Sequence, residues 1–356
     1  MADNKFQIYT EGDDLYQDML DSIASAKTSI VLESYIFEAD AISKSFIDAL
    51  LERANTGVDV RLHLDAFGSL ELALSKQINR IETSNVKLKW YNPWCWYRPF
   101  HYNHRNHRKL LVVDNAIAWL GGFNIHNENS MLEYGDNRWL DTHIKIEGPL
   151  AGEAKSLFEQ LWNKLNVYSP EIDSSSESII VTNVTWRQRR QFRQHLTSKF
   201  KAATRQLWLC TPYFMPDRFL EKQLARAAKR GVDVRLLLPH KTDRPVARWV
   251  ARAAYHSLIM SGVKIYEYNP RFLHSKIMLI DDEWTTIGST NLDYRSFFVN
   301  LEINLISYSP NLIKPLHNIY LDNLSHSEQI QLNSLVKDRW LSTIYQAIGY
   351  FCRKLL

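Results

Sequence analysis

Two copies of one short pattern of reactive side chains lie far apart in the chain. Each copy reads His-x-Lys-x4-Asp and continues, after six further residues, into Gly-(Gly/Ser)-x-Asn. Imidazole, ammonium and carboxamide groups suit a phosphodiester: one histidine attacks phosphorus, another protonates the departing alkoxide, and the cations and amides hold the developing charge. This chemistry requires no metal ion. The residues are His107, Lys109, Asp114 and Asn124 in the first copy and His274, Lys276, Asp281 and Asn291 in the second.

The residues around each copy predict a strand, a turn and a return strand. LLVVD (110–114) and IMLID (277–281) are typical of buried strands that end in turns, and the runs that follow are typical of return strands. Alternate residues of a strand point to one face, so each His and its Lys should project side by side. The Asn that ends the return strand can come back beside them. Asp114 and Asp281 belong to the predicted catalytic set with the two His and the two Lys, although their place at the turn suits bracing the backbone or a lysine better than reacting.

The duplication extends well beyond the motif. Two further segments of the first half recur in the second. SIVLESYIF (29–37) matches QLWLCTPYF (206–214), and VKLKWYNP (86–93) matches VKIYEYNP (263–270). The string GVDVRL occurs in both halves. Short Val/Ile/Leu runs alternate with helix-length amphipathic segments, which indicates an α/β fold. We therefore predict two tandem repeats, each a mixed β-sheet flanked by helices, packed about a pseudo-two-fold axis so that both histidines meet at one site. The expected boundaries are a first repeat 1–168, a linker 169–178, a second repeat 179–335 and a C-terminal amphipathic helix 336–356.

Composition narrows the class of protein. The 356 residues are 45% hydrophobic and 23% charged, which excludes wholesale disorder. Three cysteines without C-x-x-C spacing argue against a disulfide framework or a cysteine-built zinc site. The net charge of +4 suits an anionic partner but is small for a dedicated nucleic-acid binder. Neither a signal peptide nor an apolar run of about 18 residues is evident, so no transmembrane span is expected.

The doubled pattern resembles the HKD motif of the phospholipase D superfamily. Segments such as LESYIF (32–37), NHRKLLVVD (106–114) and GSTNLDYRSFFVNLEIN (288–304) are similar to bacterial cardiolipin synthases, in the form that lacks N-terminal transmembrane helices. The resemblance implies a covalent mechanism in which His107 forms a phosphohistidine and His274 is general acid and then base.

The resemblance also assigns the supporting residues. It implies that carboxylates hydrogen-bond and orient the two histidines, which fixes the imidazole tautomers. Gly122 stands where many members have Ser, which removes one hydroxyl from the phosphate cradle. The phosphate-binding residues would be Lys109, Lys276, Asn124, Asn291 and Ser289, and the orienting carboxylates would be Asp141 and Glu302.

The implied function is a cardiolipin synthase without a cofactor, peripheral on the cytoplasmic face of the bacterial inner membrane. The substrates would be phosphatidylglycerol and, as an alternative donor, phosphatidylethanolamine; no nucleic acid is expected. Three alternatives stay open: a hydrolytic phospholipase D that releases phosphatidic acid, a nuclease-type phosphodiesterase, and a non-catalytic membrane-binding module.

Four further features have two interpretations each. His101 and His104 precede His107 at intervals of three, but no matching Cys or carboxylate supports zinc. The aromatic segment 90–105 either enters a lipid interface or caps the core. The segment 336–356 is either an interfacial helix, the interpretation we favour, or a docked terminal helix. The basic run Arg187, Arg189, Arg190 and Arg193 is either a solvated face or an addition to membrane attraction.

Overall fold

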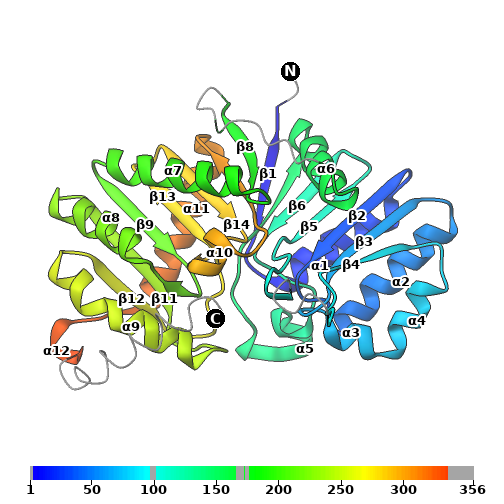
Figure 1. The fold of residues 1–356 in the computed structure, drawn as a ribbon, viewed down its shortest axis with the longest axis horizontal. Helices are drawn as coiled ribbons and strands as arrows, with labels where there is room; N and C mark the ends of the chain where they lie inside the picture. Colours follow the sequence, from blue (N-terminus) through cyan, green and yellow to red (C-terminus); the bar gives the residue numbers. More distant parts are fainter. Residues whose placement is uncertain (1–2, 97–101, 166–171, 173–175, 336–356) are drawn as a thin grey trace. The chain divides into compact units, whose positions relative to one another are not determined.

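The chain folds into two compact units. In the computed structural model, residues 3–96, 102–165, 172 and 176–335 are described (Figure 1). The predicted C-terminal helix 336–356 and most of the predicted linker lie outside the described residues.

The division between the units is not a single cut. The first unit comprises Met1–Pro170 together with Asn300–Asn304, and the second comprises Glu171–Val299 together with Leu305–Leu356. A short segment from late in the chain therefore belongs to the first unit.

The described part of the first unit has a seven-stranded mixed sheet in the order β1-β7-β6-β5-β2-β3-β4. Strands β2, β3 and β4 are parallel, whereas β5, β6, β7 and β1 join by antiparallel pairing. The bounds are β1 Lys5–Tyr9, β2 Ser29–Ser34, β3 Asp59–Asp65, β4 Lys87–Tyr91, β5 Leu110–Val113, β6 Ile117–Gly121 and β7 His143–Glu147.

Helices cover both faces of this sheet because its strands are apolar on both sides (Figure 1). Helices α1 (Gly12–Ser25) and α2 (Ala41–Asn55) pack with Val60, Leu62 and Leu64 of β3 in one core. Alternate residues of β3 point the other way, toward α6 (Pro149–Trp162). Three shorter helices follow β3 and β6: α3 Leu70–Leu74, α4 Lys76–Glu82 and α5 Met131–Tyr134.

The sheet of the second unit repeats this order and adds one strand, β17, beside β12. Its described residues form the order β17-β12-β11-β9-β13-β14-β16-β8, so β9, β11 and β12 correspond to β2, β3 and β4, and β13 and β14 to β5 and β6. This confirms the prediction of two α/β repeats. The bounds are β8 Ser178–Thr182, β9 Gln206–Cys210, β11 Asp233–Pro239, β12 Lys264–Tyr268, β13 Ile277–Ile280, β14 Trp284–Gly288, β16 Ile303–Ser307 and β17 Ser327–Gln329.

Helices of the second unit again lie on both sheet faces (Figure 1). Helices α7, α8 and α9 contribute to one core, whereas α11 packs on the opposite face, where Tyr320 stacks on Trp208. Helix α7 begins with a capping box in which Thr185 and Gln188 exchange side-chain and backbone hydrogen bonds. The bounds are α7 Trp186–Ala202, α8 Arg218–Lys229, α9 Pro245–Met260, α10 Tyr294–Phe298, α11 Pro310–Ser325 and α12 Leu332–Leu335, and the short strands β10 Phe214–Met215 and β15 Leu292–Asp293 pair with each other.

The predicted strand–turn–strand around each motif is confirmed. Strands β5 and β6 are joined through Asp114 and Asn115, with φ of 52° and 60°, and β13 and β14 through Asp281 and Asp282, with φ of 54° and 57°. Paired positive φ values suit a tight hairpin, and Asp and Asn tolerate this conformation better than most residues. Within the described residues, no helix has the length and apolar character needed to cross a bilayer.

Candidate active site

The first motif lies where β5 begins. This is the side of the sheet formed by the carboxyl ends of the parallel strands β2, β3 and β4, and we call it the edge that carries His107. His107 and Lys109 immediately precede β5, and both side chains are buried. The Lys109 Nζ donates to the His107 carbonyl at 2.9 Å, so the ammonium stays beside the imidazole. The ring of Tyr35, just after β2, meets the His107 ring edge-on at 5.1 Å and lies 5.3 Å from Lys109 Nζ.

Glu302 contacts His107. It belongs to Asn300–Asn304, the segment from late in the chain that is part of the first unit. Its Oε2 lies 2.9 Å from Nδ1 of His107, and the Glu302 side chain is fully buried. The backbone holds this segment in register, because the His107 amide donates to the Leu301 carbonyl and the Leu301 amide donates to the Arg105 carbonyl, both at 2.9 Å. The geometry matches the orienting role that the family resemblance implies for Glu302.

Buried polar networks fix the chain just before His107. The carboxylate of Asp65, at the end of β3, accepts the Asn106 amide at 2.8 Å and lies 3.3 Å from Arg105. Behind this contact, Arg108 pairs with Glu33 at 2.9 Å, and both side chains are fully buried. Burial alone would raise the pKa of Glu33, but Arg108 and a hydrogen bond to His63 lower it by more, so the carboxylate stays ionised. Such a framework rigidly holds the segment that leads into β5.

Asn124 follows β6 and is anchored beside the same sheet edge. Its side-chain oxygen accepts the Ile36 amide at 3.2 Å, and its carbonyl accepts the Tyr16 hydroxyl at 2.5 Å. The side-chain nitrogen is a donor that does not take part in the Ile36 contact.

Gly122 leaves no gap at the site, because Asp141 fills the space that a side chain would take. A Cβ built on Gly122 would lie 2.0 Å from Oδ1 of Asp141. Asp141 is fully buried and accepts the backbone amide of Thr142 at 2.7 Å. A Ser at this position would therefore displace the Asp141 carboxylate.

We expect Gly122→Ser to lower the free energy of unfolding by about 1–3 kcal/mol, the usual cost of overpacking. Turnover should fall at least tenfold, because the family resemblance implies that the displaced carboxylate orients one of the motif histidines. The matched control is Gly152→Ser in α6, where a Cβ would make an ordinary 3.5 Å contact with Asn115. Thermal denaturation and a lipid-product assay on both variants check this; equal turnover in the two would contradict it.

The second motif repeats the arrangement at the start of β13. His274 and Lys276 are buried, and the Lys276 Nζ lies 2.8 Å from Nδ1 of His274 and also donates to the His274 carbonyl. The His274 ring lies against Phe272 at 5.6 Å and against Tyr213 at 6.1 Å between centroids. An ammonium is only a donor, so Nδ1 of His274 accepts this hydrogen bond.

The remaining predicted residues of the second motif lie beyond β14. Ser289 and Asn291 are both buried. The Asn291 backbone amide lies 3.2 Å from the Ser296 hydroxyl, and its side-chain oxygen has no hydrogen-bond partner among residues 176–335 and the other described segments. The Asn291 carboxamide is therefore not committed to holding the fold.

The two motif aspartates lie at the far ends of their strands and bind backbone. Asp114 accepts the amides of Lys27, Thr28 and Ser29 at 2.7–3.0 Å, and Asp281 accepts those of Thr204, Arg205 and Gln206 at 2.8 Å. Burial raises the pKa of both carboxyls, but these amides lower it by more, so both pKa values fall below the usual range. We interpret both aspartates as bracing residues, which agrees with their predicted place at the turn.

Two histidines, His101 and His104, precede the first motif. His104 is exposed, and His101 lies outside the described residues. Over the described segments, no group of three His, Cys, Asp or Glu side chains is placed to hold a metal ion.

Sequence reasoning missed the two tyrosines that pack against the motif histidines. Tyr35 and Tyr213 lie in the matched segments SIVLESYIF and QLWLCTPYF, one position out of register. The sequence signal that could have identified them is a tyrosine that follows the corresponding strands β2 and β9 in both halves. Each ring packs edge-on against its imidazole.

Comparison with known proteins places this geometry in a family. The family model described as "Cardiolipin synthase, PLD-like domain" matches residues 19–162 and 196–323, one match in each half of the chain. The cardiolipin synthase of Clostridium perfringens strain 13 is 31% identical over 361 residues, covering 97% of this chain and 75% of the relative. Cardiolipin synthase 1 of Staphylococcus aureus strain COL is 32% identical over 354 residues, covering 93% and 69%.

Two solved structures share the fold at low identity. The phosphatidylserine synthase of Haemophilus influenzae Rd KW20 has a TM-score of 0.71 at 13% identity, covering 99% of this chain and 95% of that one. The polyphosphate kinase of Porphyromonas gingivalis has a TM-score of 0.64 at 16% identity, covering 93% and 49%. Because the family model matches both halves and the relatives align along nearly the whole chain, the chain belongs to the cardiolipin synthase family, the phosphatidyltransferases of the phospholipase D superfamily.

Proposed function

We propose that the protein makes cardiolipin by transferring a phosphatidyl group from a donor phospholipid to phosphatidylglycerol through a phosphohistidine on His107. The observation that carries this proposal is the opposite hydrogen bonding of the two motif imidazoles. Nδ1 of His107 faces the carboxylate of Glu302, whereas Nδ1 of His274 faces the ammonium of Lys276.

This difference supports different protonation at the two reactive Nε2 atoms. A carboxylate accepts, so Nδ1 of His107 carries the proton and Nε2 keeps a lone pair for attack. An ammonium donates, so Nδ1 of His274 is an acceptor and its proton resides on Nε2. The first arrangement suits a nucleophile. In the second, Nε2 of His274 can give its proton to the leaving oxygen as Nδ1 takes a proton from the Lys276 ammonium, so the ring stays neutral.

The proposed reaction has two balanced steps at one phosphorus atom, to which both motifs contribute. In the first, a bond forms between Nε2 of His107 and phosphorus, the bond to the headgroup oxygen breaks, and His274 gives that oxygen its proton. In the second, His274 takes the proton from a hydroxyl of phosphatidylglycerol, whose oxygen bonds to phosphorus as the His107 bond breaks. Lys109, Lys276, Asn124 and Asn291 would bind the phosphoryl oxygens, with Ser289.

A lipid-product assay distinguishes transfer from hydrolysis. With vesicles that contain phosphatidylglycerol, we expect cardiolipin and free glycerol as the main products, because the phosphohistidine must react with a lipid hydroxyl before water reaches it. Vesicles in which phosphatidylethanolamine is the only donor, with labelled phosphatidylglycerol as acceptor, identify the donor. Predominant phosphatidic acid would show a hydrolytic phospholipase D instead.

The apolar surface of the first unit supports contact with a membrane at the edge that carries His107. Segments after β3, β4 and β6 all leave the sheet at this edge, and α3 and α5 lie at the same end (Figure 1). Leu74, Trp96 and Leu132 are 81%, 77% and 85% exposed there. Other exposed apolar residues of these segments are Phe67, Leu70, Trp94, Met131 and Tyr134. Exposed aliphatic and Trp side chains around a lipid-processing site suit the bilayer interface.

We expect the double variant Leu74→Glu with Leu132→Glu to bind vesicles at least tenfold more weakly. Each buried leucine contributes about 1.5–3 kcal/mol, and the introduced carboxylates repel an anionic surface. The matched control is Met260→Glu with Leu321→Glu, which changes two exposed apolar residues of the second unit. Vesicle sedimentation measures both. If both double variants lost the same amount of binding, this edge would have no special role.

A further inference from the structure

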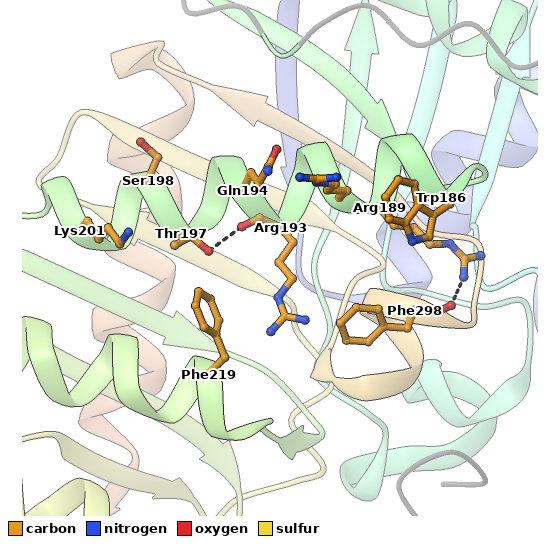
Figure 2. A pocket seen from close by; sticks show the side chains of 10 residues that line it. Trp186, Arg189, Arg193, Gln194, Thr197, Ser198, Lys201, Phe219 and Phe298 are labelled. Atoms are coloured by element: carbon orange, nitrogen blue, oxygen red, sulfur yellow. Dashed lines mark hydrogen bonds between the residues drawn. The ribbon is translucent and has the colours of Figure 1, made fainter.

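A surface pocket of about 450 Å³ lies in the second unit (Figure 2). Helix α7 forms one wall, and Phe219 of α8 and Phe298 of α10 form the other. This volume suits a small ligand or part of a lipid molecule. None of the residues that line it belongs to either His-x-Lys-x4-Asp motif.

The periodicity of α7 explains how the pocket forms. Gln188, Phe192, Leu196 and Phe200 recur every four residues and are buried against the core. The polar face carries Arg190, Arg193, Thr197 and Lys201, again three or four residues apart, together with Trp186 at the start. Each residue of this set therefore points toward the pocket.

The pocket is strongly cationic. Four basic residues line it and no carboxylate does: Arg189, Arg190, Arg193 and Lys201. Arg193 pairs with Asp217 at the rim, and Arg189 donates to the carbonyls of Phe298 and Val299. Within the described residues, Arg190 and Lys201 have no ion-pair partner, so their charges are available to an anion.

Aromatic side chains supply the rest of the lining. The guanidinium of Arg193 lies between two rings, 4.9 Å from the Phe219 centroid and 4.8 Å from that of Phe298 (Figure 2). Trp186 is 73% exposed at the entrance, with Arg190 5.5 Å from its ring. An inorganic anion would use the cations and leave these rings in water, whereas an anionic amphiphile would use both.

We propose that this pocket binds one anionic phospholipid molecule outside the catalytic site. The phosphate lies against Arg190 and Lys201, and the glycerol and first acyl carbons lie against Phe219, Phe298 and Trp186. The basic and aromatic residues surround a single hollow of about 450 Å³, which suits one headgroup better than a nucleic-acid strand of several nucleotides. A second lipid site of this kind would hold the enzyme on membranes that are rich in anionic lipid.

A local probe separates this pocket from the catalytic site. The 11 tryptophans are replaced by 5-fluorotryptophan in the full chain, and the fluorine resonance of Trp186 is the one missing from Trp186→Phe. The His107→Ala variant is used as background, so that no turnover occurs. Dihexanoyl phosphatidylglycerol, below its micelle concentration, should shift the Trp186 resonance saturably, and dihexanoyl phosphatidylcholine should need at least a tenfold higher concentration.

Charge-matched variants test the proposed ligands. Arg190→Glu with Lys201→Glu should weaken the Trp186 response at least tenfold, whereas Lys229→Glu with Lys314→Glu, which changes net charge equally at exposed positions, should preserve it. Equal loss in both double variants would overturn the proposal, as would an unchanged response in the first. Equal affinity for inorganic phosphate would show a simple anion site, and displacement of the lipid by oligonucleotide would show a nucleic-acid site; either result would overturn it too. These outcomes do not depend on whether the enzyme makes cardiolipin.

Discussion

Replacing His107 with Ala should abolish phosphatidyl transfer, with a fall in turnover of about four orders of magnitude or more. No other group can form the covalent bond to phosphorus in the proposed scheme. The fold should survive, because the main-chain contact between residue 107 and Leu301 does not involve the imidazole. The matched control is His104→Ala, which removes an exposed histidine three residues earlier and should retain full turnover.

The covalent intermediate gives this prediction a second readout. Acid-labile, base-stable phosphate on the wild-type chain should map to the peptide containing His107 after rapid quenching with labelled donor. The His107→Ala chain should carry no label. Label on the His274 peptide in the wild type would reverse the roles assigned to the two histidines.

Replacing His274 with Ala should produce a loss that depends on the leaving group. With a natural phospholipid, the departing alkoxide needs a proton, and we expect turnover to fall by about two to four orders of magnitude. With a p-nitrophenyl phosphodiester of the lipid, the leaving phenolate needs no acid. The first step should then proceed at a rate close to that of the wild type.

The same variant should stop after that first step. Without a base to deprotonate the second hydroxyl, labelled phosphohistidine should accumulate, seen as a burst of p-nitrophenol equal to the enzyme concentration. The exposed residue His256 provides a control, since His256→Ala should behave as wild type with both substrates. An equal loss of the first step with both leaving groups would contradict a general-acid role for His274.

Local patterns made the motif hairpins and their turns predictable. Apolar runs ending in Asp114-Asn115 and Asp281-Asp282 determine strand, turn and return strand over fewer than twenty residues, and the structure has each of them. The place of each Asp at the turn followed from the same spacing, since a residue at the end of a strand lies near the backbone of its neighbour. The duplication then implied two similar sheets.

Long-range contacts could not be predicted in the same way. Glu302 and His107 are 195 residues apart, and no spacing rule assigns a segment of the second half to the first unit. The reason for Gly122 was equally inaccessible, because the Asp141 carboxylate that excludes a side chain comes from another part of the chain. Family resemblance named both carboxylates without giving their packing.

The crossing of residues 300–304 into the first unit limits how this polypeptide can be divided. A fragment that stops at residue 170 would keep its own sheet and His107 but would lack Glu302 and the backbone ladder through Leu301. Truncation therefore cannot isolate the first unit intact, because residues 300–304 come from the other half of the chain. Co-expression of separate halves, rather than either half alone, is the arrangement in which the imidazole would regain its carboxylate.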